Sequence, residues 1–262
     1  MLWQDIERIR AEAPLVHNIT NYVVMNTTAN ALLAIGASPV MAHAVDEVEE
    51  MAGLARALVL NIGTLSPAWI EAMVRAGLAA GRRGIPIVLD PVGSGATSLR
   101  TATARRLLDE VKPTIVRGNA SEIASLVAAD AGTKGVDSTR AAEETVELAH
   151  AVAGRWGCCV VVSGPTDIVV GGGKLMRVGN GHPMMPRVTG MGCTATALVA
   201  AVAAVNPVAC QAAAHGMALT GIAGEMAAEH SEGPGSFQVR FLDALHRIGE
   251  ADVGRHLKLW EG

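Results

Sequence analysis

The sequence predicts an α/β protein: a three-layer α/β/α sandwich around a mostly parallel central sheet. Short runs of Val, Ile, Leu and Ala, apolar on both faces, alternate with helical segments of about ten or more residues. Strands buried on both faces and linked by helices are typical of parallel sheets covered on both sides. The chain has 262 residues and no composition break that would mark a linker, so we expect a single domain over residues 1–262.

The first half of the chain repeats a strand-helix unit. A helix over Leu2–Glu12 ends before Pro14, and the strand Leu15–Asn18 follows. Ser66 and Pro67 mark a helix start, since serine caps helices and proline suits their first turn. The remaining elements expected here are helix Asn21–Ile35, ended by Gly36, strand Ser38–Met41, helix Asp46–Ala55, strand Ala57–Gly63, helix Ser66–Gly81, strand Ile85–Asp90, helix Leu99–Val111 and strand Thr114–Arg117.

In the second half of the chain, the alternation of strands and helices continues to Ser163 and then changes. Two runs flank Gly171–Gly173 and predict a hairpin that extends the sheet with antiparallel strands. The alanine-rich segments beyond it predict helices that pack closely through small side chains. The expected elements are helix Ser121–Ala129, a Gly-rich turn, helix Thr139–Ala153, strands Cys158–Ser163, Asp167–Val170 and Lys174–Val178, helices Cys193–Val205 and Pro207–His230, and a final helix Phe237–Ile248 that closes the domain.

Composition narrows the function classes. The net charge is −4, no Lys/Arg cluster is present and aromatic residues make up 3% of the chain, which argues against a nucleic-acid partner. The longest apolar run, Ala195–Val205, is about half of the ~20 residues that a membrane span requires. Residues 1–8 lack the pattern of a secretory signal, so we expect a cytoplasmic protein with a small-molecule substrate.

The four cysteines, at positions 158, 159, 193 and 210, form no CxxC pair. This spacing favours neither a disulfide framework nor a zinc site. Cys158 and Cys159 are neighbours on one predicted strand, so their side chains should point to opposite faces of the sheet.

The stretch Thr189–Ala197 is the most informative of the chain. Gly190, Met191 and Gly192 form a turn that leads directly into a predicted helix. Glycine allows close backbone approach, and the free N–H groups and dipole of the helix start favour an anion such as phosphate. We therefore predict an anion-binding turn at Gly190–Gly192.

Cys193 follows this turn at the expected start of the helix. The helix dipole favours a thiolate there, which would let Cys193 act as a base, a nucleophile or a proton acceptor. The alternative role is that of a small buried hydrophobic residue, because cysteine is among the most buried residue types.

Two carboxylates and an arginine follow predicted strands. Ligands of open parallel sheets bind at the carboxyl ends of the strands, where Asp90, Arg117 and the Asn119–Glu122 segment are expected. Asp90 and Glu122 suit a magnesium ion held largely through water, and Arg117 suits a phosphate clamp. Their alternative roles are a turn cap, a favourable helix-start charge and an exposed surface charge.

An anion turn, two acids and an arginine together predict phosphoryl transfer. In this chemistry the protein positions phosphates and neutralises charge, while one group accepts the proton of the substrate hydroxyl. Cys193 is placed to be that group.

Five motifs, in order and spacing, resemble the hydroxyethylthiazole kinase family. They are Pro14–Asn21, Gly36–Met41, Leu89–Gly93, Arg117–Glu122 and Val188–Cys193, and the resemblance extends over about residues 10–230. It implies a ribokinase-like fold without a lid domain. It also implies phosphorylation by ATP and Mg²⁺ of the hydroxyl of 4-methyl-5-(2-hydroxyethyl)thiazole, a salvage step in thiamine biosynthesis.

The resemblance also assigns roles to single residues. It implies substrate contacts for Asn21, Met41 and Gly190, ATP contacts for Arg117 and Ser163, and a metal-binding role for Asp90 and Glu122. Cys193 takes the place of the aspartate base of the wider ribokinase-like superfamily. Family members are homotrimers with substrate sites at subunit interfaces, so we expect the same assembly here.

Three other functions compete with this one. The first is a related small-alcohol kinase, such as a hydroxymethylpyrimidine kinase, against which Asn21 and Met41 argue. The second is a cysteine-nucleophile acyl transferase or hydrolase that pairs Cys193 with His17 or His43 as base. The third is a protein that binds a thiazole or thiamine without consuming ATP.

Overall fold

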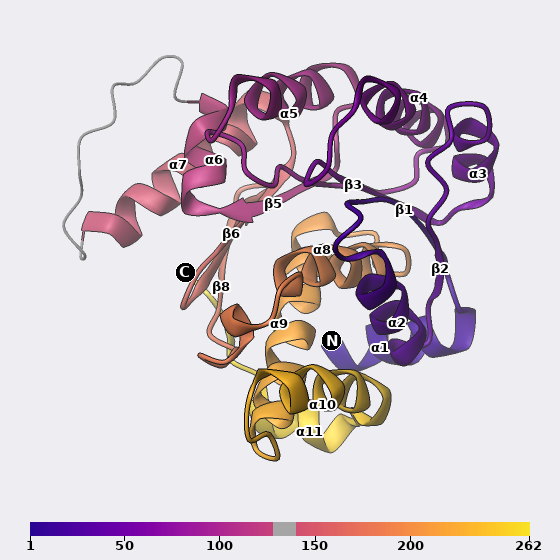
Figure 1. Cartoon of the computed structure of the whole chain (residues 1–262). Coiled ribbons are helices and arrows are strands. Elements are labelled where there is room, and N and C mark those ends of the chain that lie inside the picture. Colours follow the sequence, from indigo (N-terminus) through magenta and orange to yellow (C-terminus); the bar gives the residue numbers. More distant parts are fainter. Residues whose placement is uncertain (128–139) are drawn as a thin grey trace.

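The computed structural model describes residues 1–127 and 140–262, and the described residues form the predicted α/β/α sandwich (Figure 1). Within them the sheet has nine strands in the order β2-β1-β3-β4-β5-β6-β7-β8-β9. Strands β2 to β6 of this order are parallel, and β7, β8 and β9 are antiparallel. The strands are β1 (Leu15–Ile19), β2 (Ser38–Val40), β3 (Ala57–Asn61), β4 (Ile87–Asp90), β5 (Ile115–Asn119), β6 (Cys159–Ser163), β7 (Asp167–Gly171), β8 (Lys174–Val178) and β9 (Leu259–Glu261).

Helices cover both faces of the sheet. The helices are α1 (Leu2–Glu12), α2 (Met25–Ile35), α3 (Val48–Leu54), α4 (Pro67–Arg83), α5 (Ser98–Glu110), α6 (Ala120–Val127), α7 (Arg140–Trp156), α8 (Met191–Ala203), α9 (Ala209–Ala228), α10 (Pro234–Arg247) and α11 (Glu250–His256). Helices α3 to α7 lie on one face, and α1, α2 and α8 to α11 lie on the other (Figure 1). Each face has its own apolar core, and the two cores are separated by the sheet.

Two packing predictions are confirmed. Cys158 belongs to the core beneath α4 to α7, and its neighbour Cys159 belongs to the opposite core. Helices α8 and α9 approach closely, because a Cβ on Gly216 would lie 2.6 Å from the Cα of Val199. Small side chains therefore let these two helices meet backbone to backbone.

The prediction that the helix Phe237–Ile248 closes the domain is wrong. Helix α11 and strand β9 follow it, and β9 pairs with the edge strand β8. The strand has only three residues, too few to show an alternating pattern, and it forms because β8 offers a free edge. The predicted end of the helix Ser121–Ala129, the Gly-rich turn and residue 139 lie outside the described residues.

A second helix boundary differs in a way that matters for the site. Helix α2 begins at Met25 rather than at Asn21. The Asn21 carbonyl instead accepts a turn hydrogen bond from the amide of Val24, at 3.2 Å. This turn frees the Asn21 side chain to point toward the end of β3.

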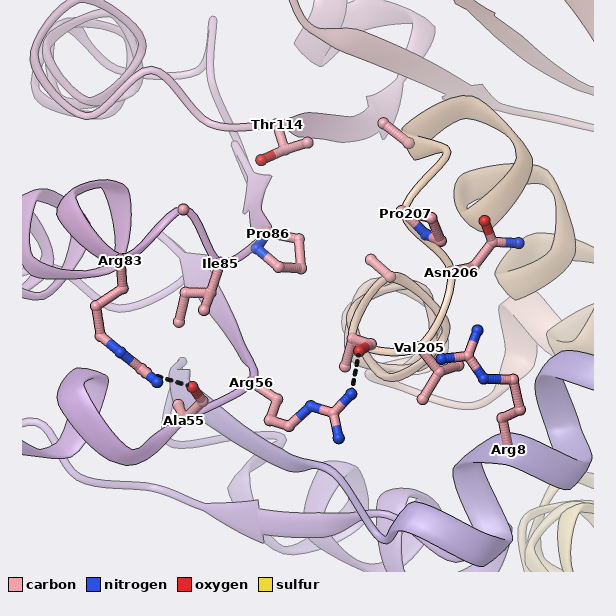
Figure 2. Close-up of a pocket in the computed structure, with 14 residues that line it drawn as sticks. Arg8, Ala55, Arg56, Arg83, Ile85, Pro86, Thr114, Val205, Asn206 and Pro207 are labelled. Atoms are coloured by element: carbon pink, nitrogen blue, oxygen red, sulfur yellow. Dashed lines mark hydrogen bonds between the residues drawn. The ribbon is translucent and has the colours of Figure 1, made fainter.

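A hollow of about 590 Å³ opens at the amino ends of β3, β4 and β5, away from the strand ends where ligands of such sheets bind (Figure 2). Arg56 and Arg83 line it, and their guanidinium groups donate to backbone carbonyls of Ala204 and of Ala52 and Ala55. These carbonyls end helices α8 and α3, whose negative dipole ends the arginines neutralise. We interpret the arginines here as helix caps.

A buried acid contributes stability that depends on pH. Asp5 accepts hydrogen bonds from Asn206, at 2.8 Å, and contacts His215 Nδ1 at 2.6 Å. Burial acts to raise the pKa of Asp5, but the His215 and Asn206 contacts outweigh it and lower the pKa. The stability from ionised Asp5 is therefore present at neutral pH and lost as the pH falls through this lowered pKa.

We expect Asp5→Asn to lower the free energy of unfolding at pH 7 by about 2–4 kcal/mol, since it removes the ionised carboxylate that Asn206 and His215 contact in a buried site. The deficit should shrink as the pH falls from about 4, where Asp5 of the unfolded chain takes up a proton, through the lowered pKa, where Asp5 of the folded wild type also becomes neutral. Urea unfolding at fixed chain concentration measures both values, with the exposed neighbour variant Glu7→Gln as control. A deficit that stays constant with pH would contradict this account.

Candidate active site

A chain of hydrogen bonds links three strand ends at the carboxyl edge of the sheet. Asn61 and Asp90 pair in register at the ends of β3 and β4. Asn61 donates to Asp90 Oδ2 at 2.9 Å, and the Asn21 amide donates to Asn61 Oδ1 at 2.9 Å. Thr196 of α8 also donates to Asp90 Oδ2, at 2.8 Å. The network fixes Asp90 beside the start of α8.

Asn61 and Thr196 received no role in the sequence analysis. Asn61 ends a buried strand as Asp90 does, which is the signal that places it at the same edge. Thr196 follows Cys193 by three residues, so both share one side of the helix. The bonds to Asp90 and Asn21 depend on strand order, which the sequence alone does not give.

The predicted anion turn has the required geometry. Gly190 is the N-cap of α8, with a φ of 81°, and a Cβ there would lie 2.5 Å from Val24 Cγ1. Glycine is therefore required by both backbone and space. Among the described residues no side chain caps this helix start, so the first amides of α8, which begins at Met191, are available to a ligand.

Arg117 lies against the same turn. Its guanidinium donates to Ser163 Oγ at 2.9 Å, and a Cβ on Gly192 would lie 2.7 Å from Arg117 Nη1. Arg117 Nε is buried without a hydrogen-bond partner among the described residues. Such an unpaired charged donor beside free helix amides is suited to phosphate oxygens. The structure thus brings together Arg117, Ser163 and Gly192.

Cys193 lies in the first turn of α8, 3.5 Å from Asn21 Nδ2, but its ionisation differs from the prediction. Burial, helped by the charge of Asp90, raises the pKa of the Cys193 thiol to about 11. The Asn61, Asn21 and Arg117 contacts act in the opposite direction and do not compensate. The raised pKa runs against the expectation of a favoured thiolate, because burial disfavours the charged form of the thiol.

Asp90 and Glu122 are the two acids that the sequence analysis assigned to a metal. Glu122 accepts from the amides of Gly93, at 2.9 Å, and Asn119, at 2.8 Å. Burial, with the nearby charge of Glu122, raises the pKa of Asp90 to about 6 despite Arg117, Thr196 and Asn61. Asp90 Oδ1 is buried and has no partner among the described residues, which leaves one oxygen free for a ligand.

The histidines proposed as alternative bases do not pair with Cys193. His17 Nε2 contacts the Ala42 carbonyl at 2.8 Å, and burial lowers the pKa of this histidine. His43 Nδ1 contacts the Met41 carbonyl at 3.3 Å, and its ring packs edge-on against Trp69. The cysteine-nucleophile alternative therefore lacks its base.

Met41 lies apart from the other predicted site residues. It follows β2, the edge strand, and β1 and β3 separate β2 from the Asp90 strand. Its side chain is half-buried. A substrate that touches both Met41 and Gly190 is not accounted for by the contacts within one chain.

A pocket of about 700 Å³ adjoins Arg117 and Gly192. Met191 and Met217 supply apolar lining and Thr220 a polar group, as is common in pockets for small molecules. The other lining residues come from the end of β6 and the start of β7 with the turn between them, from the loop after β8, and from helices α8 and α9. They are Ser163, Gly164, Pro165, Asp167, Asn180, Gly181, His182, Pro183, Met185, Pro186, Ala195 and Gly221.

The sequence analysis did not predict most of the residues that line this pocket. The segment 179–186 is rich in Gly, Pro and polar residues, a composition that is typical of any loop and does not mark a binding site. Met217 and Gly221 lie inside an alanine-rich helix whose sides look alike in sequence. Their place in a pocket follows from how α9 packs beneath β5 to β8.

Comparison with known proteins agrees with this geometry. A model of the hydroxyethylthiazole kinase family matches residues 6–251. A hydroxyethylthiazole kinase of Syntrophus aciditrophicus is 57% identical over 99% of this chain and 97% of its own. One from Oleidesulfovibrio alaskensis is 58% identical over 96% of this chain and 95% of its own.

Solved structures give the same result. A hydroxyethylthiazole kinase protein from Pyrococcus horikoshii has a TM-score of 0.92 and 43% identity, covering 100% of this chain and 98% of the other. A pyridoxal kinase from Staphylococcus aureus, solved with AMP-PCP and pyridoxal, shares the fold with a TM-score of 0.66, 15% identity and coverage of 95% and 99%. By family model, sequence identity and structure, the chain belongs to the hydroxyethylthiazole kinase family.

Proposed function

We propose that this protein uses ATP to phosphorylate the primary alcohol of 4-methyl-5-(2-hydroxyethyl)thiazole, a salvage step of thiamine biosynthesis. The observation that carries the reaction type is the Arg117 guanidinium, fixed by Ser163 against the uncapped start of α8 at Gly192. Positive charge and aligned amides are what a transferring phosphoryl group requires. Membership of the kinase family supports the alcohol acceptor and the use of ATP.

The 700 Å³ pocket is the proposed site of the nucleotide. It begins at Arg117 and Gly192, where phosphates would lie, and continues between Met185 and Met217. Methionine side chains adapt to a planar base and contact it through polarisable sulfur. In this arrangement Arg117 and Ser163 bind the phosphates, and the apolar end holds the base.

Asp90 and Glu122 are the proposed magnesium-binding residues. The unpaired Asp90 Oδ1 is the kind of hard oxygen donor that Mg²⁺ prefers. In the part of the chain that the structure describes, no three His, Cys, Asp or Glu side chains cluster as a metal cage. Two carboxylates suit an ion held mainly by water and phosphate oxygens. A bound ion would neutralise charge on those oxygens.

Cys193 is the proposed acceptor of the hydroxyl proton. With a thiol pKa of about 11, only a small thiolate fraction exists at neutral pH, and it grows about tenfold per pH unit. We expect the ratio of wild-type to Cys193→Ala kcat/KM to rise about tenfold per unit between pH 8 and 10. A ratio that stays constant over this range would contradict the role of Cys193 as proton acceptor. Catalysis would then depend on Arg117 and the Gly190–Gly192 amides.

The substrate site is proposed to lie between subunits of a homotrimer. Asn21 lies beside Cys193, next to the Gly190 turn of its own chain, and Met41 of a neighbouring subunit would complete the contacts to the thiazole. Tyr22 and Val23, beside Asn21, are 65% and 68% exposed, which is unusual for large apolar side chains next to a site. A neighbouring subunit would cover them.

We expect Val23→Glu to reduce the mass in solution from three chains of 27.0 kDa to one, because it places a charge in an apolar contact. The KM for the thiazole should rise at least about tenfold, while nucleotide affinity stays within about twofold. Light scattering and initial rates measure these values. The control is Leu33→Glu, at an exposed position of α2.

The proposed function is tested by ADP release with hydroxyethylthiazole, ATP and Mg²⁺. Hydroxymethylpyrimidine and a sample without alcohol are run in parallel. We expect turnover with the thiazole. Release with the pyrimidine alone would make the chain a sister kinase, and release with neither would favour a protein that binds without phosphorylating.

A further inference from the structure

One wall of the proposed nucleotide pocket is formed by a loop rather than by a helix or a strand. Residues 179–186 connect β8 to the region of η1 (Met185–Arg187), and Gly181 has a φ of 146°. Asn180, Gly181, His182 and Met185 of this loop line the pocket. The position of these residues therefore decides the shape of the pocket.

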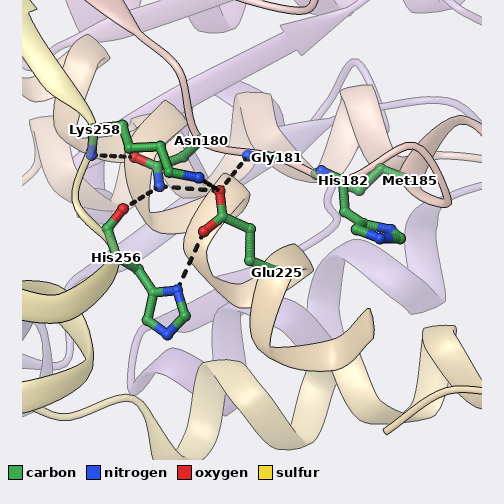
Figure 3. A network of polar contacts seen from close by, with 7 residues as sticks. All are labelled: Asn180, Gly181, His182, Met185, Glu225, His256 and Lys258. Carbon is green, nitrogen blue, oxygen red and sulfur yellow. Dashed lines mark hydrogen bonds and ion pairs between the residues drawn. The ribbon is translucent and has the colours of Figure 1, made fainter. Parts of the chain in front are cut away.

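Glu225 of α9 accepts hydrogen bonds from two residues of this loop (Figure 3). Its Oε1 accepts from the Gly181 amide at 2.9 Å and from Asn180 Nδ2 at 3.2 Å. The Glu225 side chain is 12% exposed and does not line the pocket. It thus acts on the pocket only through the loop.

The C-terminal segment completes the same network (Figure 3). His256 Nδ1 contacts Glu225 Oε2 at 3.2 Å, and Lys258 Nζ lies 3.0 Å from Oε1. Asn180 also donates to the His256 carbonyl at 2.7 Å and accepts from the Lys258 amide at 2.9 Å. The end of the chain, far from the pocket in sequence, therefore fastens the pocket wall.

The loop packs tightly against α9. A Cβ on Gly221 would lie 2.6 Å from the Asn180 carbonyl oxygen, and one on Gly224 would lie 2.6 Å from Met185 Sδ. Burial acts to raise the pKa of Glu225, but hydrogen bonds led by the Gly181 amide outweigh it and lower the pKa. Glu225 is therefore ionised at neutral pH, and its carboxylate accepts the hydrogen bonds that hold the loop.

We propose that Glu225 is a positioning residue for the nucleotide, which clamps the loop 179–186 between α9 and the C-terminal segment His256–Lys258. The proposal rests on the nucleotide pocket of the proposed function. It assigns to the segment from the end of α11 to the start of β9 a role in nucleotide binding, because His256 and Lys258 of this segment are the partners of Glu225 and Asn180.

The test is calorimetric titration of the full chain with a non-hydrolysable ATP analogue and Mg²⁺. We expect Glu225→Ala to raise the Kd about tenfold, the fold-change of ~1.4 kcal/mol, because it releases Gly181 and Asn180 together. Glu225→Gln keeps an acceptor oxygen for both and should bind within about twofold of wild type. Glu225→Asp, one methylene shorter, should weaken binding about threefold and serves if Glu225→Ala does not fold.

Matched controls separate positioning from general destabilisation. Glu229→Ala removes an exposed carboxylate four residues further along and should leave the Kd unchanged. In steady-state assays, Glu225→Ala should raise the KM for ATP and leave the KM for the alcohol within about twofold. A merely structural defect would instead reduce the active fraction and leave both KM values unchanged.

The proposal is overturned if Glu225→Ala and Glu225→Asp bind the analogue as wild type does, or if Glu225→Gln loses as much affinity as Glu225→Ala. Failure of the proposed function looks different. In that case the wild-type chain itself does not turn over the thiazole, while the order of nucleotide affinities among the variants is still measurable.

Discussion

Gly192→Ala is expected to lower kcat/KM about hundredfold without lowering stability. The added Cβ would lie 2.7 Å from Arg117 Nη1, so the guanidinium has to leave its place beside the start of α8. A displacement of about 1 Å in a phosphate-binding group is worth roughly 10²-fold in rate. The contacted atom ends a flexible side chain and alanine favours a helix over glycine, so the fold itself should not suffer.

The control for this prediction is Gly81→Ala. Gly81 lies in helix α4, and no atom comes within 4 Å of a Cβ built there. Both variants make the same chemical change in a helix, and only one faces Arg117. Initial rates at varied ATP, with thermal unfolding of both variants, measure the difference. Unchanged kinetics for Gly192→Ala would mean that Arg117 does not need its observed position.

Asp90→Asn is expected to reduce kcat by about 10²–10³-fold and to raise the magnesium concentration needed for half-maximal rate. The amide is isosteric, and its oxygen can still accept from Asn61 and Thr196. The position of Oδ1 would then hold an NH₂ group, which cannot bind a cation. The loss of rate therefore measures the contribution of the unpaired Oδ1 of Asp90.

The same variant should be more stable than wild type at pH 8. The pKa of buried Asp90 is raised to about 6, so ionised Asp90 opposes folding as the pH rises through this value, and asparagine removes the charge. Magnesium titrations and urea unfolding measure both effects, with exposed Asp46→Asn as control. A loss of stability together with unchanged magnesium dependence would contradict a metal-binding role.

The layered fold was predictable because its signals are local. Apolar runs such as Val160–Val162, with helical periods and breakers between them, indicated strands β1 to β8 and their order along the chain. The glycine turn at the start of α8 was predictable for the same reason, since Gly190 and Gly192 act through their own backbone and the helix that follows. The resemblance in five motifs then indicated the family, which the comparisons confirm.

The sequence missed features that depend on weak or distant partners. Strand β9 exists because β8 offers it an edge, and Glu225 matters because a loop and the chain terminus both reach it. Neither partner is near in sequence, so no local pattern marks these residues.

The sequence by itself determined the fold class, the family and the residue types at the strand ends. The tertiary structure decided how those residues ionise and which of them meet. Cys193 illustrates the difference: its place at a helix start was readable, but its raised pKa comes from burial and from Asp90 on another strand. Desolvation and charge act through space, so they appear only when the chain is folded.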